Sequence, residues 1–174
     1  DDKIIGNSLT KLEKVINENN KPDVIYMGFQ YKTSQNIYLP NEDSAPAKRL
    51  AEWEFPNVWD VLWKREFILK NHLVFEEEKY YEDFMFYYQG VLTSNTYAVA
   101  PFVTHIYTDD NESITRKKTL AKIKDYCYMT LKAMELANEQ EEVYQKALLK
   151  RIEKNAYWVW IGTQKLCEDN KREN

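Results

Sequence analysis

Two adjacent carboxylates, Glu82 and Asp83, stand at the expected start of a helix whose next residues are large and mostly aromatic, Phe84–Tyr88. Apolar surroundings make a carboxylate costly to desolvate, and a base that works near neutral pH is made in this way. The alternative is structural, because acidic side chains also complement the dipole of a helix N-terminus. The pair is therefore a candidate general base, with helix stabilisation as the alternative.

Helical geometry separates the roles of these two acids. Successive residues of an α-helix point about 100° apart, given 3.6 residues per turn, so only one of Glu82 and Asp83 faces a given cleft. The two carboxyl groups of a glycosidase face each other across the sugar at about 5 to 9.5 Å. Neighbouring helical residues do not meet this requirement, so the pair argues against a glycosidase.

Composition limits the class of protein. The 174 residues fit one domain or a large piece of one, with 44% hydrophobic and 30% charged residues. Aromatic residues reach 14%, with 13 Tyr and 5 Trp, which supplies ring surface for a core or for stacking on a sugar. The formal net charge of −4 gives no basic surface for nucleic acid.

Cysteine usage and the chain start bear on location. Cys127 and Cys167 fall on two successive expected helices, too far apart for a disulfide, which favours a reducing cytoplasm. No apolar run approaches the ~20 residues that span a bilayer, and there is no signal peptide. Because the chain opens on Asp1-Asp2 without Met, we expect a fragment of a cytoplasmic protein. No cluster has zinc spacing, and His105 is expected to be a structural histidine with satisfied hydrogen bonds.

Apolar periodicity predicts a helix-rich α/β fold. Strands are expected at 24–29, buried on both faces, and at 96–107, with a kink at Pro101. Residues 32–43 are expected to form a loop or edge hairpin with a weak strand at 37–39, and 46–55 is ambiguous. Helices are expected at 8–17 (capped by Ser8, with Leu9, Leu12, Val15 and Ile16 on one face), 56–71, 82–92, 115–137 and 140–167.

The last two helices are expected to pack on each other as a C-terminal hairpin, 115–174, after a first part at 1–114. Each carries an apolar stripe. The predicted stripes are Leu120, Ile123, Cys127, Leu131 and Met134 on the first helix, and Tyr144, Leu148, Ile152, Ala156, Val159 and Leu166 on the second.

Several local patterns occur in a fixed order along roughly the first 118 residues. They are Asp1-Asp2, Leu9-Thr10-Lys11-Leu12, Asp23-Val24-Ile25, the segment from Trp59 to Ile68 (WDVLWKREFI), the segment from Tyr80 to Phe86 (YYEDFMF), and Tyr107 followed by Asn111-Glu112-Ser113-Ile114-Thr115-Arg116. This order and spacing resembles the second half of bacterial family 2 glycosyltransferases of the GT-A fold. Those proteins typically show a Trp-containing helix ending in Lys/Arg-Arg-x-Phe, then Tyr-Glu-Asp, a strand and Ser-Ile-Thr.

The resemblance implies a partial GT-A-like mixed sheet and a nucleotide-sugar-dependent transferase. Such enzymes are usually inverting, and the acceptor would be a saccharide or lipid-linked molecule of surface polysaccharide synthesis. By the resemblance, Asp83 is the base and Glu82 its supporting neighbour or an acceptor contact. Asp1 and Asp2 are the expected ligands of Mn²⁺ or Mg²⁺ in the full-length enzyme, where the ion would neutralise the leaving diphosphate. We expect this chain alone not to bind the ion.

Four residues are expected to contact substrate. Trp59 could stack on the acceptor sugar, with a plain core ring as the alternative. Lys64 and Arg65 could contact phosphate, with solvated helix charges as the alternative. The basic residue that the family often places after the strand Tyr is absent, since Thr108 and acidic residues follow Tyr107, and Arg116 is the candidate to replace it.

The nucleotide-binding half of such enzymes is absent from this stretch, so we expect the chain alone to bind no nucleotide sugar and to be inactive. A non-enzymatic helical interaction module is the alternative function. The run Tyr157–Ile161 (YWVWI) motivates it, because it widens the apolar stripe beyond one packed face. This run could serve a homodimer through the C-terminal helices or a peripheral membrane contact, and packing inside the hairpin is the alternative.

Overall fold

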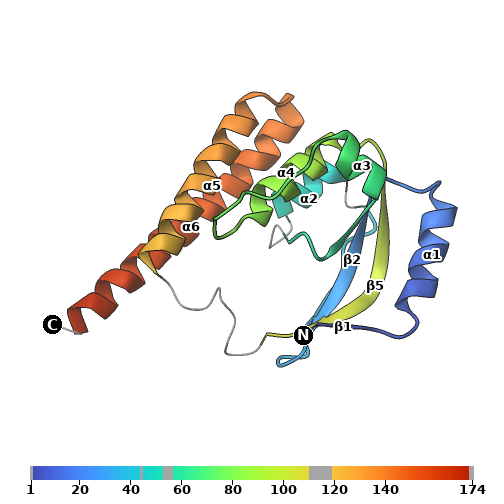
Figure 1. Ribbon diagram of the computed structural model, residues 1–174, viewed down its shortest axis with the longest axis horizontal. Coiled ribbons are helices and arrows are strands. Elements are labelled where there is room, and N and C mark those ends of the chain that lie inside the picture. Colours follow the sequence, from blue (N-terminus) through green and yellow to red (C-terminus); the bar gives the residue numbers. More distant parts are fainter. Residues whose placement is uncertain (1, 44, 53–56, 110–118, 173–174) are drawn as a thin grey trace. The chain divides into compact units, whose positions relative to one another are not determined.

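The computed structural model describes residues 2–43, 45–52, 57–109 and 119–172, and within them it shows the expected helix-rich α/β fold with a mixed sheet (Figure 1). Five strands pair: β1 (Lys3–Ile4), β2 (Val24–Tyr31), β3 (Ile37–Tyr38), β4 (Val61–Trp63) and β5 (Tyr97–Tyr107). The helices are α1 (Ser8–Glu18), α2 (Pro46–Glu52), α3 (Arg65–Lys70), α4 (Asp83–Thr93), α5 (Leu120–Asn138) and α6 (Glu142–Arg172). No helix in these ranges is long and apolar enough to cross a bilayer.

The described residues form two compact units, and each is treated by itself. The first unit holds the sheet, α1 and α3, from residues 2–43, 45–46, 57–73 and 90–109. The second unit holds most of α2, the start of α4, and α5 and α6, from residues 47–52, 74–89 and 119–172. The C-terminal helices thus share a unit with two earlier segments of the chain, 47–52 and 74–89.

In the first unit, β2 and β5 pair in parallel along their whole lengths. The short β1 lies antiparallel to β5, while β3 and β4 pair antiparallel with the other edge of β2. The first six residues of β2 are buried, which confirms the strand predicted to be covered on both faces. The sheet therefore brings the chain start beside the end of β5.

A β-bulge interrupts the β2–β5 pairing beside Gly28. Met27 pairs with Ala100, Gly28 with Val103 and Phe29 with His105, so the extra residues on β5 are Pro101, Phe102 and Thr104. The Pro101 kink predicted from sequence is this bulge. A Cβ on Gly28 would lie 2.7 Å from the Phe102 carbonyl oxygen, so only glycine fits the close backbone approach.

Replacing Gly28 with alanine is expected to lower the free energy of unfolding by about 1–3 kcal/mol, because the new methyl group must displace backbone atoms. Gly6 is the matched control, since a Cβ there would meet no atom within 4 Å. Gly6→Ala should change stability by less than about 0.5 kcal/mol. Urea unfolding of both variants measures the difference, and equal stabilities would contradict the bulge argument.

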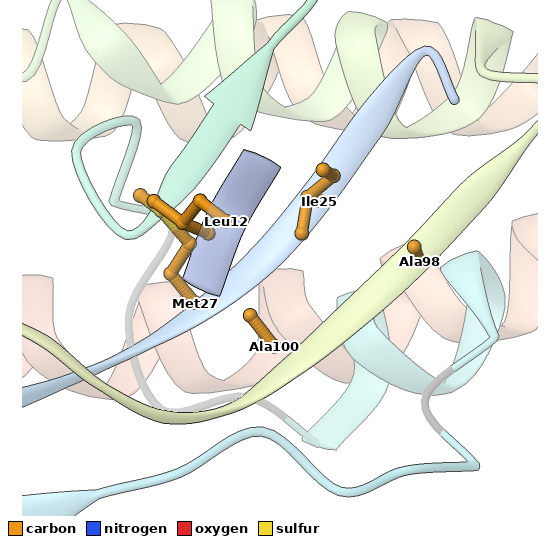
Figure 2. Close-up of a cluster of buried hydrophobic side chains, with 5 residues drawn as sticks. All are labelled: Leu12, Ile25, Met27, Ala98 and Ala100. Carbon is orange, nitrogen blue, oxygen red and sulfur yellow. The ribbon is translucent and has the colours of Figure 1, made fainter. Parts of the chain in front are cut away.

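Helix α1 covers one face of the sheet through a small apolar cluster that Figure 2 shows. The cluster residues are Leu12, Ile25, Met27, Ala98 and Ala100. Two predictions about α1 were wrong: Leu9 is 63% exposed, and Ser8 does not cap the helix. The Ser8 hydroxyl instead donates to the Ile5 carbonyl, which fixes the turn from β1 into α1.

The helix predicted over 56–71 was wrong in its first half. Residues 61–63 form strand β4, and among the described residues of the segment 57–71 only Arg65–Lys70 are helical. This segment pairs with the edge of β2 that β5 does not occupy, and the Met27 amide also donates to the Asp60 carbonyl at 2.8 Å. Apolar periodicity alone misses this, because strand formation depends on an available neighbouring strand.

In the second unit, α5 and α6 lie side by side as the predicted hairpin (Figure 1). The stripe predicted on α5 was wrong, since Leu120, Leu131 and Met134 are exposed. The buried residues of α5 are Lys122, Met129, Thr130, Ala133 and Ala137. Three of these five residues, Thr130, Ala133 and Ala137, are small, whereas the predicted stripe consisted mainly of large apolar residues. On α6, Leu148 and Ile152 are buried as predicted, but Ala156 is exposed.

Candidate functional site

The start of the chain places Asp2 at the carboxyl end of β5. In the antiparallel register Lys3 lies opposite Ile106, so Asp2 reaches the residue that follows β5. The Thr108 amide donates to Asp2 Oδ1 at 2.8 Å, which fixes the exposed carboxylate at this edge. In open α/β sheets ligands bind outside the carboxyl ends of the strands, so this edge of the first unit is where a ligand is expected.

His105 lies near this carboxylate, and one of its ring nitrogens is buried without a hydrogen-bond partner among the described residues. The Thr104 hydroxyl donates to the Gly28 carbonyl at 2.9 Å, so its oxygen can only accept from His105 Nδ1, also at 2.9 Å. Nδ1 therefore carries the proton, and Nε2 carries the lone pair. Nε2 is buried and has no hydrogen-bond partner among the described residues, which contradicts the expected fully satisfied structural histidine.

Burial lowers the pKa of His105, and the nearby Asp2 carboxylate opposes this shift. The ring is 9% exposed and lies between aromatic neighbours, 6.0 Å from Phe29 and 5.3 Å from Trp59 by ring centroids. A neutral imidazole with a bare nitrogen can accept a hydrogen bond or bind a cation. Asp2 and His105 thus interact electrostatically, but the buried Nε2 is closed to solvent.

Within the described residues no group of three or more His, Cys, Asp or Glu side chains could hold a metal ion. A complete site needs further ligands from substrate, water or other residues. Asp1, the other predicted ligand, lies outside the described residues, as does Arg116.

Trp59 belongs to an aromatic cluster at the same end of the sheet. Its ring stacks on Tyr107 with a centroid distance of 4.6 Å and an interplanar angle of 8°. Phe29 meets it edge-on at 4.7 Å. Because Tyr107 covers one face of the half-buried indole, only the other face is left for a sugar ring.

Lys64 and Arg65 lie at the opposite end of β2. The Lys64 amide donates to the Asp23 carbonyl at 2.9 Å, and its ammonium donates to the Lys21 carbonyl at 3.3 Å. At about 3.3 Å per residue, the length of β2 separates them from the Asp2 end by about 23 Å. Lys64 lines a separate pocket of 190 Å³ with Asp23, Glu66, Phe67, Lys70, Asn71 and Asn95. The structure therefore does not bring Lys64 and Arg65 together with Asp2.

In the second unit, Asp83 is the first residue of α4, and Glu82 precedes the helix. Asp83 is half-buried, whereas Glu82 is exposed, so the two acids have different surroundings. Tyr81 has a φ of 62°, a left-handed conformation that is costly for a bulky residue. Such strain persists only where the surroundings hold it, and it concentrates at functional sites.

Helix α5 holds this strained segment in place. Asp125 accepts from the Lys79 ammonium and from the Tyr80 amide, both at 3.1 Å. The Tyr81 ring packs edge-on against Tyr126 at 4.6 Å, and Lys132 pairs with Glu76. These contacts fix the backbone that leads into Asp83. Sequence reasoning missed them, because polar residues on a helix are usually solvated.

A buried polar network contains two tyrosines on which the Asp83 charge acts electrostatically. Asn155, 1% exposed, donates to the Tyr88 hydroxyl at 3.1 Å and accepts from the Tyr126 hydroxyl at 3.4 Å. Burial raises the pKa of Tyr88 to about 12, while buried Arg151 lowers it and Asp83 raises it. Burial also raises the pKa of Tyr126 well above its usual value, with the same two opposing charges. Both phenols stay neutral at physiological pH.

The Tyr88 shift makes stability depend on alkaline pH. The pKa of Tyr88 in the folded chain is about 12, above the ordinary value of 10. Its contribution to the free energy of unfolding is therefore complete below pH 10 and is lost as the pH rises towards 12. We expect the raised pKa of Tyr88 to lower the free energy of unfolding by about 1.4 kcal/mol at pH 11 relative to pH 9. The raised pKa of Tyr126 adds a loss of the same sign, so urea unfolding at both pH values should show a smaller loss in Tyr88→Phe than in the unmodified chain, by about 1.4 kcal/mol. Equal pH dependence in the two proteins would contradict it.

Comparison with known proteins gives a fold match only. No protein-family model and no curated protein matches this chain. S. aureus TarS 1-349 in complex with UDP-GlcNAc matches with a TM-score of 0.65 and 18% identity, over 88% of this chain and 47% of that one. TarS 1-349 in complex with UDP matches with a TM-score of 0.62 and 19% identity, over 87% and 44%. A longer TarS structure matches with a TM-score of 0.65 and 16% identity, over 90% and 27%. The chain thus spans less than half the length of these proteins.

Proposed function

We propose that this chain is the acceptor-side part of a family 2, GT-A-type glycosyltransferase that transfers a sugar from a nucleotide sugar to a saccharide or lipid-linked acceptor. The observation that carries the proposal is the fold shared with TarS, whose crystals hold UDP-GlcNAc and UDP. The order of the Trp59–Ile68 and Tyr80–Phe86 segments supports it independently. Because the chain spans less than half of TarS 1-349, the proposal concerns the enzyme that contains this chain.

Asp83 is the proposed general base. The acceptor hydroxyl gives its proton to the Asp83 carboxylate as its oxygen bonds to the anomeric carbon, and the bond from that carbon to the nucleoside diphosphate breaks. Attack from the face opposite the leaving group inverts the anomeric centre. The half-buried position of Asp83 and its fixed backbone suit a positioned base. Glu82, exposed beside it, is the proposed acceptor contact or supporting neighbour.

The first unit is proposed to serve the donor and acceptor at the carboxyl end of β5. A Mn²⁺ or Mg²⁺ ion would neutralise the leaving diphosphate, with Asp2 and the predicted ligand Asp1 as its protein ligands. The face of Trp59 that Tyr107 does not cover is the proposed sugar-stacking surface. The phosphate contacts predicted for Lys64, Arg65 and Arg116 stay predictions. Surface polysaccharide synthesis is the proposed role.

Nucleoside diphosphate release tests the function. The enzyme that contains this chain is incubated with UDP-GlcNAc, Mn²⁺ and a panel of saccharide and lipid-linked acceptors, and with other UDP-, GDP- and TDP-sugars in parallel. We expect release that depends on one donor and rises when an acceptor is added. Consumption of none of these donors, with a folded protein, would overturn the proposal.

A further inference from the structure

The aromatic run on α6 is exposed. Tyr157, Trp158 and Trp160 are 56%, 50% and 55% exposed, so the alternative that these rings pack inside the hairpin is wrong. The exposed acids Glu153 and Glu168 share this face with its lysines, and its charge therefore favours no particular partner. The homodimer and the peripheral membrane contact stay predictions.

The loop that precedes the proposed base, residues 76–82, has a closed and strained backbone. Its two ends meet, because the Glu76 amide donates to the Glu82 carbonyl at 3.4 Å. Tyr81, near the end of the loop, has the left-handed φ of 62°. A tyrosine has no intrinsic preference for this conformation, so contacts outside the loop must hold it.

The conformation of Tyr81 decides where α4 begins. The Tyr81 carbonyl accepts from the Phe84 amide at 3.1 Å, which closes a turn over Glu82 and Asp83. Asp83 is the first residue of α4. A change in the backbone at Tyr81 would therefore move the Asp83 carboxylate directly.

Asp125 on α5 holds the backbone of this loop. Its Oδ2 accepts from the Tyr80 amide at 3.1 Å, and its Oδ1 accepts from the Lys79 ammonium at 3.1 Å. The Asp125 side chain is only 16% exposed, so both hydrogen bonds are largely shielded from water. Hydrogen bonds to an ionised acceptor are stronger than neutral ones, and shielding strengthens them further. Asp125 thus fixes the residue immediately before the left-handed Tyr81.

Tyr126, the next residue of α5, holds the side chain of Tyr81. The two rings pack edge-on with centroids 4.6 Å apart, and the Phe84 ring also meets Tyr126 edge-on at 5.1 Å. Two successive residues of α5 therefore hold the backbone of Tyr80 and the ring of Tyr81. All these residues belong to the second unit.

We propose that Asp125 is a positioning residue for the base Asp83. By holding the Tyr80 amide it keeps Tyr81 left-handed, and the turn from Tyr81 to Phe84 then aims the Asp83 carboxylate at the acceptor hydroxyl. This role deepens the proposed sugar transfer and rests on it. Asp125 itself touches no substrate, and its effect on the rate comes through the placement of Asp83, where an error of about 1 Å costs about 10²-fold.

Single-turnover rates of the enzyme that contains this chain test the proposal. Asp125→Ala removes both hydrogen bonds and should lower kcat about 10- to 100-fold, with the affinity for UDP-GlcNAc unchanged. Asp125→Asn keeps an oxygen that accepts from the Tyr80 amide, so kcat should stay within about threefold. Lys79→Met removes only the partly exposed ion pair and should also change kcat by less than about threefold. An unchanged kcat in Asp125→Ala would overturn the proposal.

The Asp83→Asn background separates positioning from a general structural role. Because no carboxylate is left to place, Asp125→Ala should lower the remaining kcat of Asp83→Asn by less than about twofold. Glu135→Ala, which removes an exposed acid of α5, should leave kcat unchanged in both backgrounds. An equal loss from Asp125→Ala with and without the Asp83 carboxylate would overturn the proposal, since Asp125 would then act on the fold as a whole.

Hydrogen exchange of residues 74–86 in the same enzyme gives a readout that does not depend on transfer. Asp125→Ala should speed exchange of the Tyr80 amide by about tenfold or more, because the loop opens more often, whereas Glu135→Ala should not. Circular dichroism confirms that the variants are folded. An unmodified enzyme that consumes no donor would overturn the sugar transfer itself. Unchanged exchange in Asp125→Ala, in an enzyme that does transfer sugar, would overturn the role of Asp125 alone.

Discussion

Replacing Asp83 with asparagine is expected to lower kcat of the enzyme that contains this chain by about 10²–10⁴-fold, the usual contribution of a general base. The amide keeps the shape of the side chain but cannot accept the acceptor's proton. Donor binding should be unchanged, because Asp83 acts on the acceptor hydroxyl. Single-turnover assays give the rate, and calorimetry with UDP-GlcNAc gives the donor affinity.

Glu82→Gln is the matched control for this variant. Glu82 is adjacent, also acidic and more exposed, so both substitutions remove one negative charge from the same turn. We expect Glu82→Gln to change KM for the acceptor more than kcat, since an acceptor contact acts mainly in binding. Equal losses of kcat in both variants would indicate a shared electrostatic effect, and the assignment of Asp83 as base would then be wrong.

Replacing Asn155 with alanine is expected to lower the free energy of unfolding by about 2–4 kcal/mol. The variant removes a buried amide, leaves the Tyr88 and Tyr126 hydroxyls without this partner, and opens a small cavity. Urea unfolding measures the loss. Glu153→Gln, an exposed change on the same helix, should alter stability by less than about 0.5 kcal/mol. A loss below about 1 kcal/mol for Asn155→Ala would show that the network is dispensable.

The same network connects stability to the candidate site. Arg151 and Asp83 both act electrostatically on Tyr88 and Tyr126, and α5 fixes the backbone before Asp83. We infer that the C-terminal helices, which matched no motif, position the proposed base. Asn155→Ala should therefore also lower kcat, and glutamine at this position should restore stability only in part, because its longer side chain is misplaced.

The sequence predicted the elements whose patterns depend on local chemistry. The strand at 24–31 and the strand at 97–107 follow from apolar runs rich in β-branched and aromatic residues, bounded by polar turns. The helical hairpin follows from its long amphipathic pattern. The segment 61–63 was mispredicted, because its strand state needs the free edge of β2, which no local pattern reveals.

Some residues of the candidate site can be recognised in the sequence, and others cannot. The Glu82-Asp83 pair is visible in the sequence as adjacent acids before aromatic residues. The tautomer of His105 cannot be read from the sequence. It depends on the hydrogen bond from Thr104 to the Gly28 carbonyl, 76 residues away along the chain. Asp125 and Asn155 were also missed, since their partners lie 45 and 67 residues away along the chain. Long-range partners of polar side chains are set by the fold.

The position of the transferred sugar relative to Asp83 tests the central claim most directly. A crystal structure of the enzyme that contains this chain, with UDP-GlcNAc and Mn²⁺ bound, would measure it. The account predicts that Asp83 is the carboxylate nearest the anomeric carbon, on the face opposite the UDP. A structure in which the Asp83 side chain points away from the sugar, or in which another base occupies that face, would contradict it.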